Sequence, residues 1–116
     1  MPALIEDLTI EQGADFQREY TITNLDGSEI PNFPNINVVG QLRDIHSNLI
    51  FDLDITVTGS KTILLWIKYG ESELLNIYKQ HYYKFDIEGT LPNGIRYRLV
   101  DARVTSKQEQ TKTTIV

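Results

Sequence analysis

Two histidines and a closely spaced pair of aspartates are the residues of this 116-residue sequence best suited to binding a metal or moving a proton. His46 and His81 lie far apart, and neither has another ligand-type residue at the spacing of a zinc site. Asp52 and Asp54 alternate with apolar residues, which would place both carboxylates on the solvent face of one strand. No glycine-containing calcium loop surrounds them. We therefore expect no metal site.

No motif for covalent catalysis or phosphate chemistry stands out. No serine fits a nucleophile elbow, and no glycine-rich loop fits a phosphate site. The sequence has no cysteine, which excludes disulfide bonds and thiolate zinc sites as means of holding the fold. An enzyme needs a nucleophile, a base or a metal in a defined mutual relation. We accordingly expect a protein that is not an enzyme, with no catalytic residues and no cofactor.

Aromatic and basic residues of the second half could form a ligand-binding face. Four of them would lie on one side of two neighbouring strands, where rings and cations can stack on sugars or bases. These four are Tyr82, Lys84, Arg96 and Arg98. Alternatively, the cations pair across the strands with acids such as Asp86. The sequence leaves both alternatives open.

The charge distribution limits the partners. A net charge of −5 argues against non-specific binding of nucleic acid, and no apolar run approaches the ~18–20 residues that span a membrane. We expect neither partner. Residues 1–58 carry ten acids and two bases, and residues 59–116 carry six acids and nine bases, so the halves have charges of −8 and +3. This asymmetry could favour head-to-tail stacking of copies, unless strands of the two halves interleave and cancel it.

Apolar residues recur with a period close to two along almost the whole chain, which indicates β-strands. The length, with 41% hydrophobic and 23% charged residues, is typical of one globular domain. We expect an all-β fold, a small antiparallel β-sandwich of the immunoglobulin-like kind with about seven strands. A closed barrel is the alternative. The expected strands begin near residues 8, 16, 38, 51, 61, 83 and 97.

Breaks in the alternation predict the turns, one helix and the domain limits. Asp-Gly at 26–27 and Asn-Gly at 93–94 predict tight turns, and residues 30–37, with two prolines and three asparagines, predict a loop. Residues 71–78 begin with acids and place leucines at helical spacing, which predicts a short helix. We expect one domain over residues 1–106. The polar remainder, residues 107–116, would be an extended arm.

The first two expected strands meet at Gly13, and we expect them to form a hairpin with Gly13 as a bulge or corner. Arg18 interrupts the apolar face of the second strand. Nothing downstream supplies a catalytic partner for Glu11, Asp15 or Glu19. We therefore expect these three acids on the solvent side of the hairpin.

A series of short motifs runs through most of the chain. It begins with LTIEQG (Leu8 to Gly13), LDGSEI (Leu25 to Ile30) and GQLR (Gly40 to Arg43), and continues with GSKTILLWI, ESELLNIY, YYKFDIEG, LPNG and YRLVDARVT. In this order the motifs resemble those of the N-terminal domains of phage baseplate upper proteins and related tail or neck proteins. The resemblance covers about residues 8–106. The segment IPNFPNIN departs from the family's usual Leu-Thr-Gly step.

The resemblance implies a non-enzymatic structural protein of a bacteriophage virion, a building block of the tail, baseplate or neck. Such a protein would be found in the virion and, during assembly, in the host cytoplasm. Its partners would be copies of itself and other phage structural proteins, and the family has no catalytic residues to transfer. Two alternatives stay open: a capsid decoration (cement) protein, and a host-surface glycan-binding module that uses the face around Tyr82.

Small β-domains usually join their neighbours through exposed strand edges and extended arms. We therefore expect the N-terminal segment MPALIEDL and the tail from Lys107 to Val116 to contact neighbouring chains. The tail would act through its two apolar terminal residues. The expected contact residues are Leu4, Ile5, Gln110, Thr111, Thr113, Ile115 and Val116.

Overall fold

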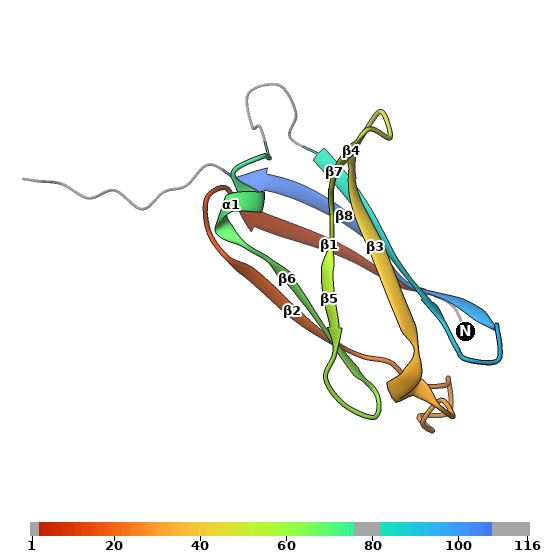
Figure 1. Ribbon diagram of the computed structural model, residues 1–116. Coiled ribbons are helices and arrows are strands. Elements are labelled where there is room, and N and C mark those ends of the chain that lie inside the picture. The colour runs from red at the N-terminus through yellow and green to blue at the C-terminus, as the bar shows by residue number, and fades with distance from the viewer. Residues whose placement is uncertain (1–2, 76–81, 108–116) are drawn as a thin grey trace, which may run out of the picture.

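The computed structural model describes residues 3–75 and 82–107, which form two packed β-sheets (Figure 1). The five-stranded sheet has the order β1-β8-β7-β3-β4, and the three-stranded sheet has the order β2-β6-β5. The strands are β1 (Leu4–Glu11), β2 (Phe16–Thr21), β3 (Asn37–Asp44), β4 (Leu49–Asp52), β5 (Asp54–Val57), β6 (Thr62–Ile67), β7 (Tyr82–Thr90) and β8 (Arg96–Lys107). The expected all-β sandwich is confirmed.

The strand order is that of an immunoglobulin-like sandwich. In that fold strands B, E and D form one sheet, and strands G, F, C and C′ belong to the other. Here β2, β6 and β5 occupy the first set of positions, and β8, β7, β3 and β4 the second. The two sheets enclose a continuous core of isoleucine, leucine, valine and aromatic side chains. Its largest fully buried members include Tyr20, Phe33, Leu42, Leu65, Ile87 and Leu99.

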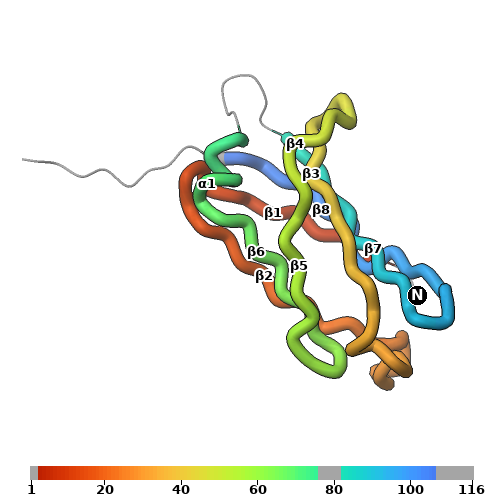
Figure 2. The backbone as a smooth tube through the Cα atoms, viewed as in Figure 1, coloured from red at the N-terminus to blue at the C-terminus, as the bar shows by residue number. Residues whose placement is uncertain are grey.

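The first strand departs from the expected hairpin. β1 pairs in parallel with β8, from Leu4 opposite Val100 to Glu11 opposite Lys107, whereas β2 pairs antiparallel with β6 in the other sheet. The connection at Gly13 (φ 81°) is therefore a corner between sheets (Figure 2). The expectation of a first hairpin was wrong at this point, and β1–β8 is the one parallel pair among the described strands, the other pairs being antiparallel. Residue alternation shows which side of a strand is buried but does not show which strand is its neighbour.

The expected strand over residues 51–58 is divided between the two sheets. β4 ends at Asp52 and pairs with β3, and β5 begins at Asp54 and pairs with β6. Leu53 is the crossing residue, and its N–H donates to the carbonyl oxygen of Gly40 at 2.9 Å. This division is why the described residues form eight strands where about seven were expected. The apolar alternation continues through the crossing, so the pattern could not reveal it.

The expected helix begins earlier than predicted. α1 covers Tyr69–Ser72, and residues 76–78 of the expected 71–78 helix lie outside the described residues. The Asp15 carboxylate accepts a hydrogen bond from the Tyr69 N–H at 2.7 Å, and the Ser72 hydroxyl donates to the Ala14 carbonyl at 2.8 Å. Asp15 thus has a downstream structural partner, which the sequence did not reveal. Through this hydrogen bond the Asp15 carboxylate connects the corner between β1 and β2 to the first residue of α1.

The two glycine turns and the proline-rich loop are confirmed. The N–H of Gly27 (φ 86°) donates to Asn24, and the N–H of Gly94 (φ 88°) donates to Leu91, each at 2.9 Å. These positive φ values explain the glycines, because a Cβ atom is strained there. The 30–37 loop contains a short 3₁₀ helix, η1 (Phe33–Asn35), whose Phe33 side chain is buried in the core.

Candidate binding surfaces

The first strand forms one edge of the five-stranded sheet and leaves apolar side chains accessible. Among the described strands β1 pairs only with β8. Ile5 is 75% exposed and Leu4 is 45% exposed. The strand is eight residues long, has no register shift and contains neither proline nor lysine, which are common protections of an edge. The other expected contact residues lie outside the described residues: Gln110, Thr111, Thr113, Ile115 and Val116.

A polar cluster joins this edge strand to the other sheet. Two nitrogen atoms of the Arg18 guanidinium, on β2, donate to the two carboxylate oxygens of Glu6, on β1, at 2.8 and 3.2 Å. The hydroxyl of Tyr20 donates to the same carboxylate at 3.0 Å, and the guanidinium lies over the Tyr20 ring at 4.6 Å. The Glu6 side chain is 15% exposed and that of Arg18 is 40% exposed. Arg18 thus interrupts the apolar face of β2 in order to bind β1.

The titration of these groups follows from their contacts. Hydrogen bonds from Arg18 lower the pKa of Glu6, with a further contribution from the Tyr20 hydroxyl. The hydrogen bond to Glu6 raises the pKa of Arg18. Burial raises the pKa of Tyr20, and the neighbouring carboxylate raises it further. At neutral pH the cluster therefore contains one carboxylate, one guanidinium and one neutral phenol. Their hydrogen bonds connect β1 of the five-stranded sheet to β2 of the three-stranded sheet.

The four residues of the expected ligand face lie on β7 and β8, but they do not converge. Tyr82 is opposite Thr105 at one end of the strand pair, and Arg96 is opposite Thr90 at the other. Eight residues along β7 correspond to about 26 Å, which is too far for one small ligand. Lys84 and Arg98 lie between these ends and line the same surface hollow, which has a volume of about 570 Å³.

The centre of this hollow contains a row of cations that sequence reasoning did not predict. Lys84 on β7 is directly opposite Arg43 on β3 and directly opposite Arg103 on β8. The Arg43 guanidinium donates to Gln41 and to the Ser47 carbonyl, neither of which is an acid. Like charges directly opposite each other destabilise a sheet. The row Arg43–Lys84–Arg103, called the cation row below, is therefore a site where a bound anion would relieve repulsion.

Nearby acids neutralise part of the positive charge of the arginines around the hollow. Arg98 lies 3.8 Å from a carboxylate oxygen of Asp86 and 3.9 Å from one of Glu88. Arg103 is paired with Asp7 of β1 at 3.1 Å. Lys84 has no hydrogen bond or ion pair with any residue in the described part of the chain. The cross-strand pairing expected as one alternative is thus present for Arg98, whereas Lys84 stays available.

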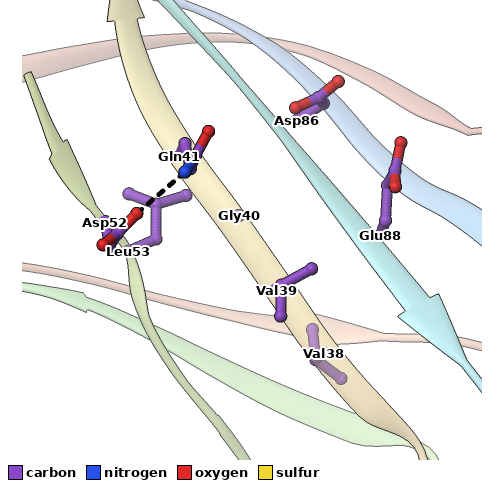
Figure 3. A pocket seen from close by; sticks show the side chains of 8 residues that line it. All are labelled: Val38, Val39, Gly40, Gln41, Asp52, Leu53, Asp86 and Glu88. Carbon is purple, nitrogen blue, oxygen red and sulfur yellow. Dashed lines mark hydrogen bonds between the residues drawn. The ribbon is translucent and has the colours of Figure 1, made fainter. Parts of the chain in front are cut away.

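A second hollow of about 610 Å³ lies along β3 (Figure 3). It is called the β3 groove below. Its lining combines apolar side chains with three carboxylates and includes no basic residue. Figure 3 shows Asp52 and Leu53 on one side of β3 and Asp86 and Glu88 on the other, with the Gln41 amide donating to Asp52 at 3.0 Å. The lining residues are Val38, Val39, Gly40, Gln41, Asp52, Leu53, Asp86 and Glu88.

The candidates for metal and proton chemistry are separated in space. Asp52 and Asp54 belong to different sheets, so the expected pair on one strand face does not exist. Asp52 accepts a hydrogen bond from Gln41, and Asp54 lies 3.9 Å from Lys68. His81 lies outside the described residues. Across residues 3–75 and 82–107, no group of three or more histidine, aspartate or glutamate side chains is placed to hold a metal.

His46 lies in the β3–β4 turn, as expected, and the residue that organises this turn is Asp44. The Asp44 carboxylate accepts hydrogen bonds from the N–H groups of His46 and Asn48 at 2.8 and 2.9 Å, and from the Asn48 amide at 3.1 Å. These bonds, first that of the Asn48 backbone, lower the pKa of Asp44. Ser47 (φ 66°) takes the left-handed conformation. An aspartate before turn-forming residues was the available signal.

Comparisons with known proteins identify no relative. No family model matches the chain, and no curated protein matches it. Among the described residues, no helix has the length and apolar character needed to cross a membrane. Two surfaces therefore carry the functional argument: the β1 edge with its apolar end, and the outer face of the five-stranded sheet with the cation row and the β3 groove.

Proposed function

We propose that this chain is a non-enzymatic structural protein of a bacteriophage particle, a β-sandwich building block of the tail, baseplate or neck. The order of motifs over residues 8–106 supports the phage assignment. The observation that carries the assembly role is the β1 edge, which is long, regular and apolar at its N-terminal end. A long, regular edge of this kind is a template for pairing with another chain. Its partners are copies of the chain and other virion proteins.

Imaging of the particle tests this proposal. The chain is expected in repeated copies in the density of the tail, baseplate or neck, with β1 against a neighbour. Density confined to the head surface would instead support a capsid decoration protein. Absence of the chain from purified particles, measured by mass spectrometry, would reject a virion role altogether.

Substitutions in the edge test its part in assembly. Combining Leu4→Lys and Ile5→Lys should lower incorporation into particles about tenfold or more, because charge blocks edge pairing. Leu25→Lys combined with Ile95→Lys, two exposed apolar residues in turns away from this edge, is the matched control and should incorporate normally. Thermal unfolding of both variants shows whether they remain folded. Normal incorporation of a folded double variant would contradict a role for this edge.

A host-surface glycan-binding module is the second candidate, and the cation row supports it. An acidic sugar placed in the hollow of about 570 Å³ would contact Lys84. The exposed ring of Tyr82 lies two residues from Lys84 along β7. Binding of sulfated or carboxylated glycans on an array, lost in Lys84→Glu, is the expected result for this candidate. An array without binders at low salt would remove it.

A further inference from the structure

Within the described part of the chain, one stretch of β3 is paired with another strand on one side only. Asn37, Val38 and Val39 pair with Thr90, Gly89 and Glu88 of β7. On the other side β4 pairs with residues from Gln41 onward, and the last hydrogen bond of that side joins the Leu53 N–H to the Gly40 carbonyl. Backbone groups of alternate residues point to the same side of a strand. The N–H and C=O of Val38 therefore point, like the Gly40 carbonyl, toward the side that β4 has left.

The β3 groove extends along this open stretch. Val38 and Val39 line it together with Leu53, and Val39 is 57% exposed. Three carboxylates line the groove as well, those of Asp52, Asp86 and Glu88. Arg98 lies 3.8 Å from Asp86 and 3.9 Å from Glu88, so it offsets part of this charge and leaves the lining acidic on balance. A segment that fits here must be extended and must present apolar or β-branched side chains to the valines, and a positive charge on it is favourable.

The C-terminal residues of this chain have that chemistry. The segment Lys112–Val116 has the sequence KTTIV, in which four of five residues are β-branched and the fifth is a cation. We propose that this segment of one copy adds as a short strand to the open edge of β3 in a second copy, with Lys112 among the groove carboxylates. The inference rests on the proposed assembly function and names the surface that accepts the arm.

The register of the sheet shows why the donor must be another copy. Val38 is opposite Gly89, which is opposite Tyr97, whereas β8 ends at Lys107. The ten residues from Tyr97 to Lys107 correspond to about 33 Å along β8. Even the nearer groove carboxylate of β7, Asp86, is opposite Asp101, about 20 Å along β8 from Lys107, and the open side of β3 lies three strand spacings of ~4.8 Å across the sheet. The five residue steps from Lys107 to Lys112 span at most about 18 Å, which is too short to place Lys112 there. A chain therefore cannot fill its own groove with this segment.

Lys107, from which the chain continues toward the donor segment, and the open stretch of β3 lie at opposite ends of the five-stranded sheet, so the proposed association runs head to tail. Asn37 is level with Arg96 at one end of the sheet, and Lys107 is level with Glu11 at the other. Contacts between different surfaces of identical chains give rings when the rotation closes and filaments when it does not. Rings of repeated chains are a geometry that a tail, baseplate or neck can use.

Cysteine cross-linking of the full chain tests the inference, because the sequence contains no cysteine. Chains with Val39→Cys, in the groove, are mixed with chains carrying Thr114→Cys under mild oxidation. A mixed disulfide dimer should form about tenfold more than with the control Thr56→Cys, an exposed position in the other sheet, because docking raises the local thiol concentration. Lys112→Glu in the donor should lower the yield, since it places a fourth negative charge in the groove.

Three outcomes would overturn the inference. One is a mixed-dimer yield no higher than with the Thr56→Cys control. A second is preferential cross-linking of Val39→Cys to Ala3→Cys, which would make the N-terminal segment the occupant. The third is a chain carrying both Val39→Cys and Thr114→Cys that closes on itself as a monomer, where a ladder of oligomers is expected. This test needs no particle, so it can fail while the virion location stands, and the virion location can fail while the cross-link forms.

Discussion

At the scale of single residues, Glu6 links the edge strand to the opposite sheet. Its carboxylate accepts hydrogen bonds from Arg18 and Tyr20, both on β2. The sequence predicted that Arg18 interrupts the apolar face of its strand, and in the structure its side chain does so and binds Glu6. Its partner could not be predicted, because Glu6 and Arg18 lie on strands of different sheets that approach only after the corner at Gly13 has formed.

We expect Glu6→Gln to lower the free energy of unfolding by about 1 kcal/mol at pH 7, since hydrogen bonds to a charged group are lost and the 40% exposure of Arg18 allows solvent screening. The pKa of Glu6 is lowered in the folded state. Its contribution to stability is therefore present above the unfolded pKa of ~4.3 and is lost as the pH falls through the folded value. Denaturant unfolding curves at pH 7 and at pH 2 measure this difference.

The neighbouring residue supplies the control. Asp7→Asn removes the pair with Arg103, and both of these side chains are largely exposed. An exposed pair contributes little, so the free energy of unfolding should stay within about 0.5 kcal/mol of that of the unaltered chain. Equal losses in the two variants, or a Glu6→Gln loss that persists at pH 2, would contradict the role given to Glu6.

At the scale of strands, the cation row shows how pairing creates a property that no single strand has. Arg43, Lys84 and Arg103 lie far apart in the sequence, and the registers of β3, β7 and β8 place them side by side. The strands β3, β7 and β8 were expected from residue alternation and are present. Their register was not predictable, because it depends on the bulge near Ile87 and on which strands become neighbours.

We expect Lys84→Glu to stabilise the isolated domain by roughly 0.2–1 kcal/mol, because an acid between Arg43 and Arg103 replaces two like-charge contacts with two attractive ones. Lys61→Glu, an exposed lysine outside the strands, is the control for the change in net charge. Thermal unfolding at low salt compares the two variants. A stability gain of equal size in the control would show that net charge, and not the row, is responsible.

At the scale of the whole molecule, strands from the two halves of the sequence are mixed in both sheets. The five-stranded sheet combines β1, β3 and β4 with β7 and β8, and the three-stranded sheet combines β2 and β5 with β6. The charge difference between the halves therefore does not divide the domain into an acidic and a basic side. The three acids of the β3 groove come from both halves. The two ends of the molecule differ instead because the open stretch of β3 lies at one end of the five-stranded sheet and the end of β8 at the other. Head-to-tail association of copies is the prediction that belongs to this scale.

The class of fold was predictable from the sequence, whereas the route of the chain was not. Alternation, glycine turns and composition were sufficient for an all-β sandwich. The crossing at Leu53 and the parallel position of β1 depend on contacts between residues far apart in the chain. The candidate surfaces also divide into one that a local segment of sequence predicted and two that depend on the assembled sheet. Exposed Leu4 and Ile5 were expected from a local segment, and the cation row and the β3 groove required the assembled sheet.

The parallel pairing of β1 with β8 has a consequence for biosynthesis. β1 is translated before the other described strands, yet the residues of β8 that it pairs with are Val100 to Lys107. The backbone hydrogen bonds of β1 must therefore wait until those residues have left the ribosome. Contacts of such long sequence separation slow folding, and an unpaired strand edge on a nascent chain is open to aggregation. Ribosome-bound chains that stop before residue 96 should therefore be more sensitive to proteases and more dependent on chaperones than the released domain.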